Sequence, residues 1–117
     1  MENEKNRQLT TLIQELKKAS SQQNVKIWRR VADDLEKPTR SMRTVNVYKI
    51  EKYAKDNDIV IVPGKVLGTG ELSKNVQVAA YHFSYSAFKK INETGKAISI
   101  MELVQKNPKG QGVKILG

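Results

Sequence analysis

The densest concentration of side chains able to do chemistry lies between Lys26 and Lys55, where nine Lys or Arg residues accompany four acids. Guanidinium groups bind phosphate in bidentate fashion and stack on bases, whereas the lysine ammonium acts as a point charge. Charge of one sign repels itself in the free protein. A polyanion relieves that repulsion, because each neutralised phosphate releases condensed counterions. The stretch therefore predicts a nucleic-acid footprint.

Trp28, Arg29 and Arg30 are consecutive, so one buried helical face cannot hold all three. If Trp28 packs with Val31 and Leu35, then Arg29 and Arg30 project outward. The spacing favours a core position for the indole, where it would fix a short helix. Stacking of the indole on an RNA base is the alternative.

Further cations follow toward the middle of the chain. Arg40 and Arg43 lie in the segment 38–44, which has no helical or strand periodicity and is expected to be a basic loop. A row of lysines then recurs every three residues: Lys49, Lys52 and Lys55. Alone, such a row is typical of a solvated helix face. Next to the arginine loop it becomes a candidate phosphate-contacting strip.

Catalytic and metal chemistry find little support in the residue types. The chain has no cysteine, and its one histidine, His82, sits in an alternating strand pattern where a packed or surface role is typical. Asp33, Asp34 and Glu36 would point in different directions on a helix, which disfavours a shared metal ion. They are expected to moderate repulsion among neighbouring cations. No cofactor is expected.

The glycine-containing segment 64–70, GKVLGTG, is a candidate phosphate-binding loop. It lacks Gly-Lys-Ser/Thr, and no helix is expected to begin after Gly70. Tight turns are the favoured explanation of these glycines. The rival is a small enzyme acting on a phosphorylated substrate. Lys65 is also placed to present its ammonium to an RNA phosphate.

Length and composition limit the fold and the partners. With 117 residues the chain is expected to form a single domain, 1–117. The net charge of +9 and a pI near 9.8 point to nucleic acid, an anionic membrane surface or an acidic protein as partner. No signal peptide or membrane-spanning run is recognisable, so a cytoplasmic location and no membrane role are expected.

Helical periodicity dominates the first third of the chain. Leu9, Leu12, Ile13 and Leu16 predict an amphipathic helix over about 5–20. A second helix is predicted over 28–35, burying Val31, Ala32 and Leu35. Asn46 is expected to cap a third helix, whose inward face would carry Val47, Ile50, Tyr53 and Ala54.

The rest of the chain alternates strands and helices. Ile59 to Val62 predicts a buried strand that Pro63-Gly64 ends, with a short extended piece at 65–67. The next predicted elements are a strand at 76–83, a helix capped by Ser84 or Ser86, a strand at 97–98, a helix at 100–106 capped by Ser99, and a strand at 113–116. This pattern predicts an α/β fold with a largely parallel sheet, residues 1–45 being a basic helical arm on a core of 46–117.

Four segments carry a resemblance to a known family: IWRRVADDLEKPTRSMRTVNVYKIEKYA, VIVPGKVLGTGEL, VQVAAYHFS and NPKGQGVKIL. They closely resemble the archaeal and eukaryotic "eighteen-e" proteins of the large ribosomal subunit, which are related to the bacterial large-subunit protein L-fifteen. The resemblance runs from about Arg7 to Leu116. Family members often have Asn-Pro-Arg-Leu where this chain has Asn6-Arg7-Gln8-Leu9.

The resemblance implies a structural, non-enzymatic component of the large subunit that binds large-subunit rRNA beside neighbouring ribosomal proteins. It also implies a core of irregular β-β-α superhelical turns. The residues it assigns to RNA contact, together with those of the basic stretch, are Arg7, Lys26, Trp28, Arg29, Arg30, Arg40, Arg43, Asn46, Lys49, Lys65 and Lys109. An RNA- or DNA-binding module outside the ribosome is the alternative, because it needs the same basic surface.

Overall fold

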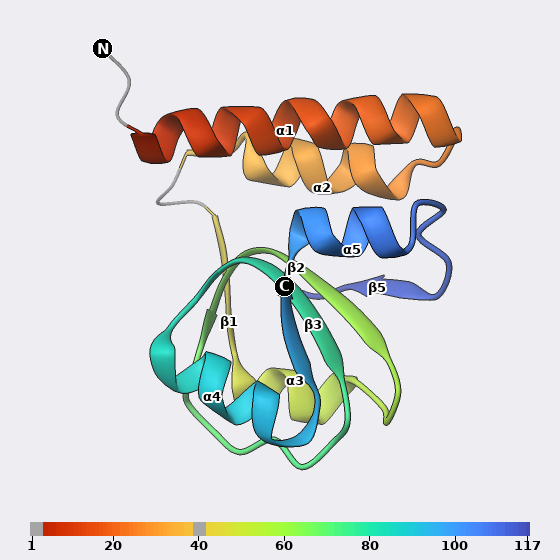
Figure 1. The fold of residues 1–117 in the computed structure, drawn as a ribbon. Coiled ribbons are helices and arrows are strands. Elements are labelled where there is room, and N and C mark those ends of the chain that lie inside the picture. The colour runs from red at the N-terminus through yellow and green to blue at the C-terminus, as the bar shows by residue number, and fades with distance from the viewer. Residues whose placement is uncertain (1–3, 39–41) are drawn as a thin grey trace.

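A parallel sheet lies between two groups of helices (Figure 1). The computed structural model describes residues 4–38 and 42–117, with only the backbone described at 4–6. Helices α3 (Val47–Tyr53) and α4 (Tyr85–Thr94) cover one face of the sheet. The other face is covered by α1 (Glu4–Gln23), α2 (Ile27–Leu35) and α5 (Ile100–Lys106). The predicted α/β class, parallel sheet and helical N-terminal portion are confirmed.

The strands described are β1 (Arg43–Asn46), β2 (Ile59–Leu67), β3 (Gln77–Phe83), β4 (Lys96–Ser99) and β5 (Val113–Ile115). Their order in the sheet is β1-β2-β3-β4, with β5 also on β2. β5 pairs with Ile59–Ile61 and β1 pairs with Gly64–Leu67, so these two strands follow one another along the same edge of β2. The long central strand therefore joins the first and last strands of the chain.

β2 owes its central position to β-branched residues on both faces. Val60 and Val62 pack under α3 and α4, whereas Ile61 packs under α2 and α5. The prediction that Pro63-Gly64 ends this strand is wrong, because the strand continues to Leu67 across a register shift between Val62 and Lys65. Gly64 lies opposite Arg43, and a Cβ there would stand 2.0 Å from the Arg43 carbonyl oxygen. Glycine permits this close approach of β1.

β1 is the element that sequence periodicity misses. Its residues, RTVN, include part of the segment expected to be a basic loop, so that expectation is wrong for Arg43 and Thr44. Val45 is buried in the core under α3 and α4, and Met42 is buried in the core under α2 and α5. The strand runs across the boundary that composition places between a helical arm and the core.

The connection from β2 to β3 is unusual for parallel neighbours, because residues 68–76 contain no helix. Leu72 is buried in the core and anchors the connection. Two lysines bind backbone carbonyls at its ends. Lys74 Nζ donates to the Glu51 and Ala54 oxygens, and Lys90 Nζ donates to the Gly68 oxygen at 2.8 Å and the Gly70 oxygen at 2.6 Å. These bonds replace the packing that a crossover helix would provide.

The helix boundaries follow the predictions with three differences. α1 continues to Gln23, beyond the polar run expected to end it. Asn46 stands at the N-cap of α3, but its side chain makes no capping bond. Tyr53 is 56% exposed, so its predicted inward orientation is wrong. The capping serines agree with the sequence: Ser84 Oγ accepts from the Ala87 N–H and Ser99 Oγ from the Glu102 N–H.

Candidate nucleic-acid interface

Three exposed cations gather where α2 begins: Lys26, Arg30 and Lys109. α2 buries Val31 and Leu35, which leaves Lys26 and Arg30 on its outer side one turn apart. Lys109 joins them because its turn packs on α2, and a Cβ on Gly110 would lie 2.6 Å from Ile27 Cγ2. Among the described residues none of the three cations has an ion-pair partner. Their charge is therefore available to a ligand.

An open hollow of about 490 Å³ lies beside two of these cations, between α2 and β5. Its walls carry Lys26 and Arg30, and its apolar floor is made by Ile27, Val113 and Ile115. Cations around an apolar floor suit a nucleotide, whose phosphate is charged and whose base is flat and apolar. Sequence reasoning missed the floor. Val113 and Ile115 are distant from α2 in sequence, and only the pairing of β5 with β2 brings them there.

Two arginines of the same basic stretch are already paired. Arg29 Nε lies 3.3 Å from Asp33 Oδ1. Arg43, with 26% of its side chain exposed, lies 3.1 Å from Asp34 Oδ2 and donates from Nη1 to the Gly117 carbonyl oxygen. Lys37 also approaches Asp34, at 3.4 Å. These acids moderate repulsion as expected, and they leave Lys26 and Arg30 as the freer cations.

Trp28 has no exposed surface, so the assignment of an RNA contact to its side chain is wrong. The indole packs in the core under α2 and α5, and its Nε1 donates a 2.8 Å hydrogen bond to the Pro108 carbonyl oxygen. The ring therefore cannot stack on a base while the chain is folded. The favoured sequence interpretation of Trp28, as a core residue that fixes α2, is confirmed.

The glycine-containing segment does not form a phosphate cradle. Phosphate loops direct backbone N–H groups at the ligand, whereas here the Gly68 and Gly70 carbonyls direct oxygen at the Lys90 ammonium. The Thr69 N–H is taken by Asn46 Oδ1, and the Thr69 carbonyl accepts from the Tyr48 N–H. Gly64 lies within β2 and allows strand contact, so tight turns explain only part of these glycines.

Comparison with known proteins decides the family. Residues 7–98 match the family of the ribosomal proteins 50S-L15 and 50S-L18e and their 60S counterpart. The chain is 49% identical over 112 residues to large ribosomal subunit protein eL18 of Archaeoglobus fulgidus, covering 95% of this chain and 96% of the relative. Proteins of the same name are similar: 47% identity over 112 residues in Methanoregula boonei (95% and 93% covered) and 45% over 115 residues in Thermoplasma acidophilum (97% and 96% covered). The chain belongs to this ribosomal protein family.

Several residues that the ribosomal resemblance assigned to RNA contact lie away from α2. Lys49 is half-buried on α3, on the opposite side of the sheet (Figure 1). Asn46 ends β1, and its amide oxygen accepts from Thr69 N at 3.3 Å. Lys65 is half-buried in β2, in register with Thr44 and His82. The expected lysine row is also shorter than predicted, because Lys55 follows the end of α3.

The remaining assigned positions lie at the N-terminal side of the ribosomal protein chain. Arg7 is exposed on α1 and lines a shallow hollow with Thr11, Glu15 and Met101 among others. Arg40 lies outside the described residues. The structure thus gathers Lys26, Arg30 and Lys109, and it separates Arg7 and Lys49 from that group.

The described residues offer no alternative catalytic or metal centre of the kinds considered from the sequence. His82 is exposed on β3, and no cluster of three metal-ligating side chains occurs in the described part of the chain. The Arg–Asp contacts of α2 are ion pairs without a cavity of their own. Among the same residues, no helix has the length and apolar character needed to cross a bilayer.

Proposed function

We propose that this member of the ribosomal family is a structural, non-enzymatic constituent of the large ribosomal subunit that binds large-subunit rRNA. Relatives covering nearly the whole chain are named as large ribosomal subunit proteins. The observation that carries the RNA role is the group of unpaired cations at the start of α2, next to an open hollow with an apolar floor. A cytoplasmic location, with rRNA and other large-subunit proteins as partners, follows from this role.

The proposed mechanism is electrostatic and architectural. Lys26, Arg30 and Lys109 neutralise phosphates of folded rRNA, which releases counterions and lowers repulsion between RNA helices. The sheet holds these groups at fixed positions, because α2 packs on it through buried Trp28 and Val31. RNA is recognised largely by shape and backbone, so base readout contributes little. Secondary contacts are proposed for Arg7, Arg29, Arg40, Arg43, Asn46, Lys49 and Lys65.

The test compares two variants that lose equal charge. Lys26→Ala with Arg30→Ala removes the unpaired pair, whereas Lys18→Ala with Lys89→Ala removes exposed lysines of α1 and α4. The probe is a transcript of large-subunit rRNA, with affinity measured across a salt series. The first variant is expected to bind about tenfold or more weakly, and to flatten the slope of log affinity against log salt by about 1.4–1.8, a value of 0.7–0.9 for each lost phosphate contact. Equal losses in both variants would refute the assignment of this site.

Assembly into the ribosome needs a separate measurement. The wild-type chain is expected to co-sediment with large subunits through a high-salt sucrose gradient, because a component embedded among rRNA helices resists salt. A chain that binds the transcript but washes off the subunits would instead be an RNA-binding module outside the ribosome.

A further inference from the structure

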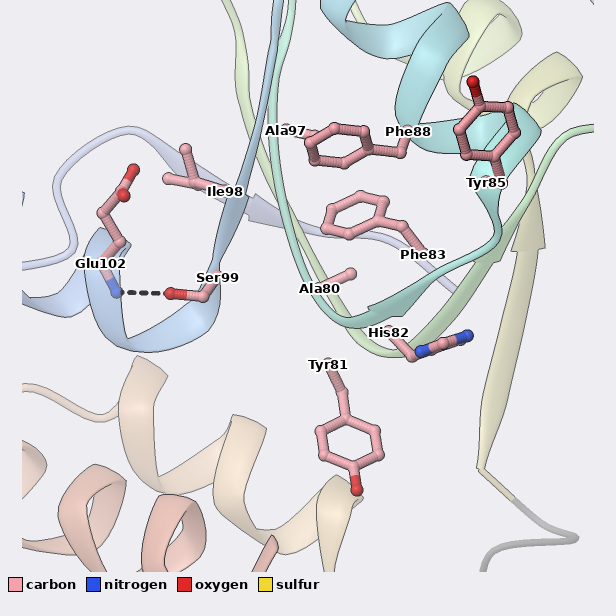
Figure 2. Close-up of a pocket in the computed structure, with 10 residues that line it drawn as sticks. All are labelled: Ala80, Tyr81, His82, Phe83, Tyr85, Phe88, Ala97, Ile98, Ser99 and Glu102. Atoms are coloured by element: carbon pink, nitrogen blue, oxygen red, sulfur yellow. Dashed lines mark hydrogen bonds between the residues drawn. The ribbon is translucent and has the colours of Figure 1, made fainter. Parts of the chain in front are cut away.

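A second, larger hollow of about 600 Å³ lies at the carboxyl ends of β3 and β4 (Figure 2). It exists because the two strands end at different heights. β4 ends at Ser99, which caps α5 through its hydroxyl, whereas β3 continues to Phe83. Strand pairing between them stops at Ala80 and Ser99. Within the described residues, the edge of β3 at Tyr81–Phe83 therefore has no strand beside it on the β4 side.

Aromatic side chains at this hollow remain exposed although they would be better buried. Phe88 is 48% exposed and Tyr85 is 83% exposed, both at the start of α4. Phe83 packs edge-on against Phe88, with ring centroids 6.3 Å apart. Figure 2 shows this aromatic group on one side of the hollow, with Ile98 and Glu102 across from it. Contiguous exposed apolar surface of this kind marks interaction sites.

The charge of this hollow differs from that of the whole chain. The chain carries a net charge of +9, yet no Lys or Arg is among the described residues that line the hollow. Its one formally charged lining group is the Glu102 carboxylate, which Lys106 approaches from outside at 3.4 Å. An acid without lining cations disfavours the phosphates of a nucleic acid. The same arrangement favours an occupant that brings a cation of its own.

We infer that this hollow, which is separate from the proposed rRNA contact on α2, docks an extended peptide segment of a neighbouring protein. The segment adds its backbone to the free edge of β3 at Tyr81–Phe83, as in other cases of strand addition. An apolar side chain of the segment packs against Phe83 and Phe88, and a Lys or Arg of the segment lies near Glu102. The protein then presents cations to RNA from α2 and an aromatic groove to a protein from β3 and α4.

The first experiment pans a phage-displayed library of random dodecapeptides on the full chain. Enriched peptides are expected to share an apolar anchor residue and a Lys or Arg. Phe88→Ser should weaken the synthetic consensus peptide by about tenfold or more, because it removes a central aromatic contact. The matched control is Tyr53→Ser, which removes an exposed aromatic from α3 and should leave affinity unchanged. Failure to enrich peptides, or equal binding by both variants, overturns the proposal.

A second measurement tests strand addition itself. Binding of the consensus peptide should slow amide hydrogen exchange at Tyr81–Phe83, which a side-chain contact alone would not do. Two controls examine other occupants. If poly(U) RNA displaces the peptide and its own binding is lost in Phe88→Ser, the groove binds RNA and the proposal is wrong. It is also wrong if sedimentation shows a dimer of the chain that Phe88→Ser abolishes.

Discussion

The indole nitrogen of Trp28 donates a 2.8 Å hydrogen bond to the Pro108 carbonyl oxygen, joining two residues that are 80 positions apart. This bond fixes the turn after α5 against the beginning of α2. The turn carries Lys109, and α2 carries Arg30. One buried aromatic residue therefore holds together cations from both ends of the chain, which gives it an indirect part in the proposed RNA contact.

Trp28→Phe is expected to lower the free energy of unfolding by about 2 kcal/mol. The phenyl ring keeps most of the packing, but the Pro108 carbonyl loses its donor and a partly buried acceptor is left unpaired. Urea unfolding followed by circular dichroism measures the change.

The same variant separates a structural role from base stacking. Phenylalanine stacks on bases as well as packing in cores, so RNA affinity alone would not distinguish the roles. Trp28 fluorescence does: in the wild-type chain, its emission should not be quenched when rRNA binds, because the ring has no exposed surface. Strong quenching on saturation with rRNA would contradict a buried ring.

Lys90→Met should destabilise the fold by about 1.5–3 kcal/mol, although lysines on protein surfaces rarely matter this much. The methionine retains the apolar stem but removes the donor that holds the Gly68 and Gly70 carbonyls. Lys89→Met is the control, because Lys89 is exposed on the same helix, and its change should stay within about 0.5 kcal/mol. Similar unfolding midpoints for the two variants would show that the connection 68–76 does not depend on Lys90.

Gly64→Ala should cost about 3 kcal/mol, at the upper end of the range for overpacked cores. The new methyl group would meet the Arg43 carbonyl at 2.0 Å, and backbone cannot swing aside as a side chain can. Hydrogen exchange should show faster opening of residues 43–46, because β1 loses its register on β2.

Gly112→Ala provides the comparison for this substitution. Gly112 has a φ of +73°, but a Cβ added there would have no neighbour within 4 Å, so only the backbone conformation is strained. Its expected cost is about 1–2 kcal/mol. If the two glycine variants lose equal stability, the contact with β1 is not the reason for glycine at position 64.

The sequence predicted the elements whose signals are local. The helix over 28–35, the serine caps of α4 and α5, and the β-branched run of β2 each depend on neighbours a few residues away. β1 could not be predicted in this way. Its four residues gain their conformation from pairing with Gly64–Leu67, and that pairing is a long-range contact.

The candidate site follows the same division. The outward orientation of Arg30 follows from burying Trp28 and Val31 on a short helix. Which arginines are free does not follow, because the partner of Arg43 depends on where β1 places it beside Asp34. The apolar floor at Val113 and Ile115 likewise requires β5 to join β2. Charge density in the sequence therefore locates a basic region, while tertiary pairing selects the cations that remain available.

Asp58 gives a prediction about pH. Its carboxylate accepts from Lys114 Nζ on β5 at 2.9 Å and from the Lys55 N–H at the end of the α3 turn at 2.8 Å. The Lys114 hydrogen bond, followed by the Lys55 bond, holds the pKa of the Asp58 carboxyl below its usual value. A carboxyl whose pKa is lower in the folded state stabilises the fold above its unfolded pKa, about 3.9. That stabilisation is lost as the pH falls through the folded pKa.

Asp58→Asn should therefore destabilise the chain at neutral pH, and the difference from wild type should shrink as the pH falls below about 4. The measurement is the unfolding midpoint in urea at a series of pH values. Lys114→Met tests the same contact from the other side: the double variant should be barely less stable than Asp58→Asn alone, because either change removes the ion pair. A difference between Asp58→Asn and wild type that stays constant from neutral to acid pH would mean that the carboxylate charge does not hold β5 to the turn after α3.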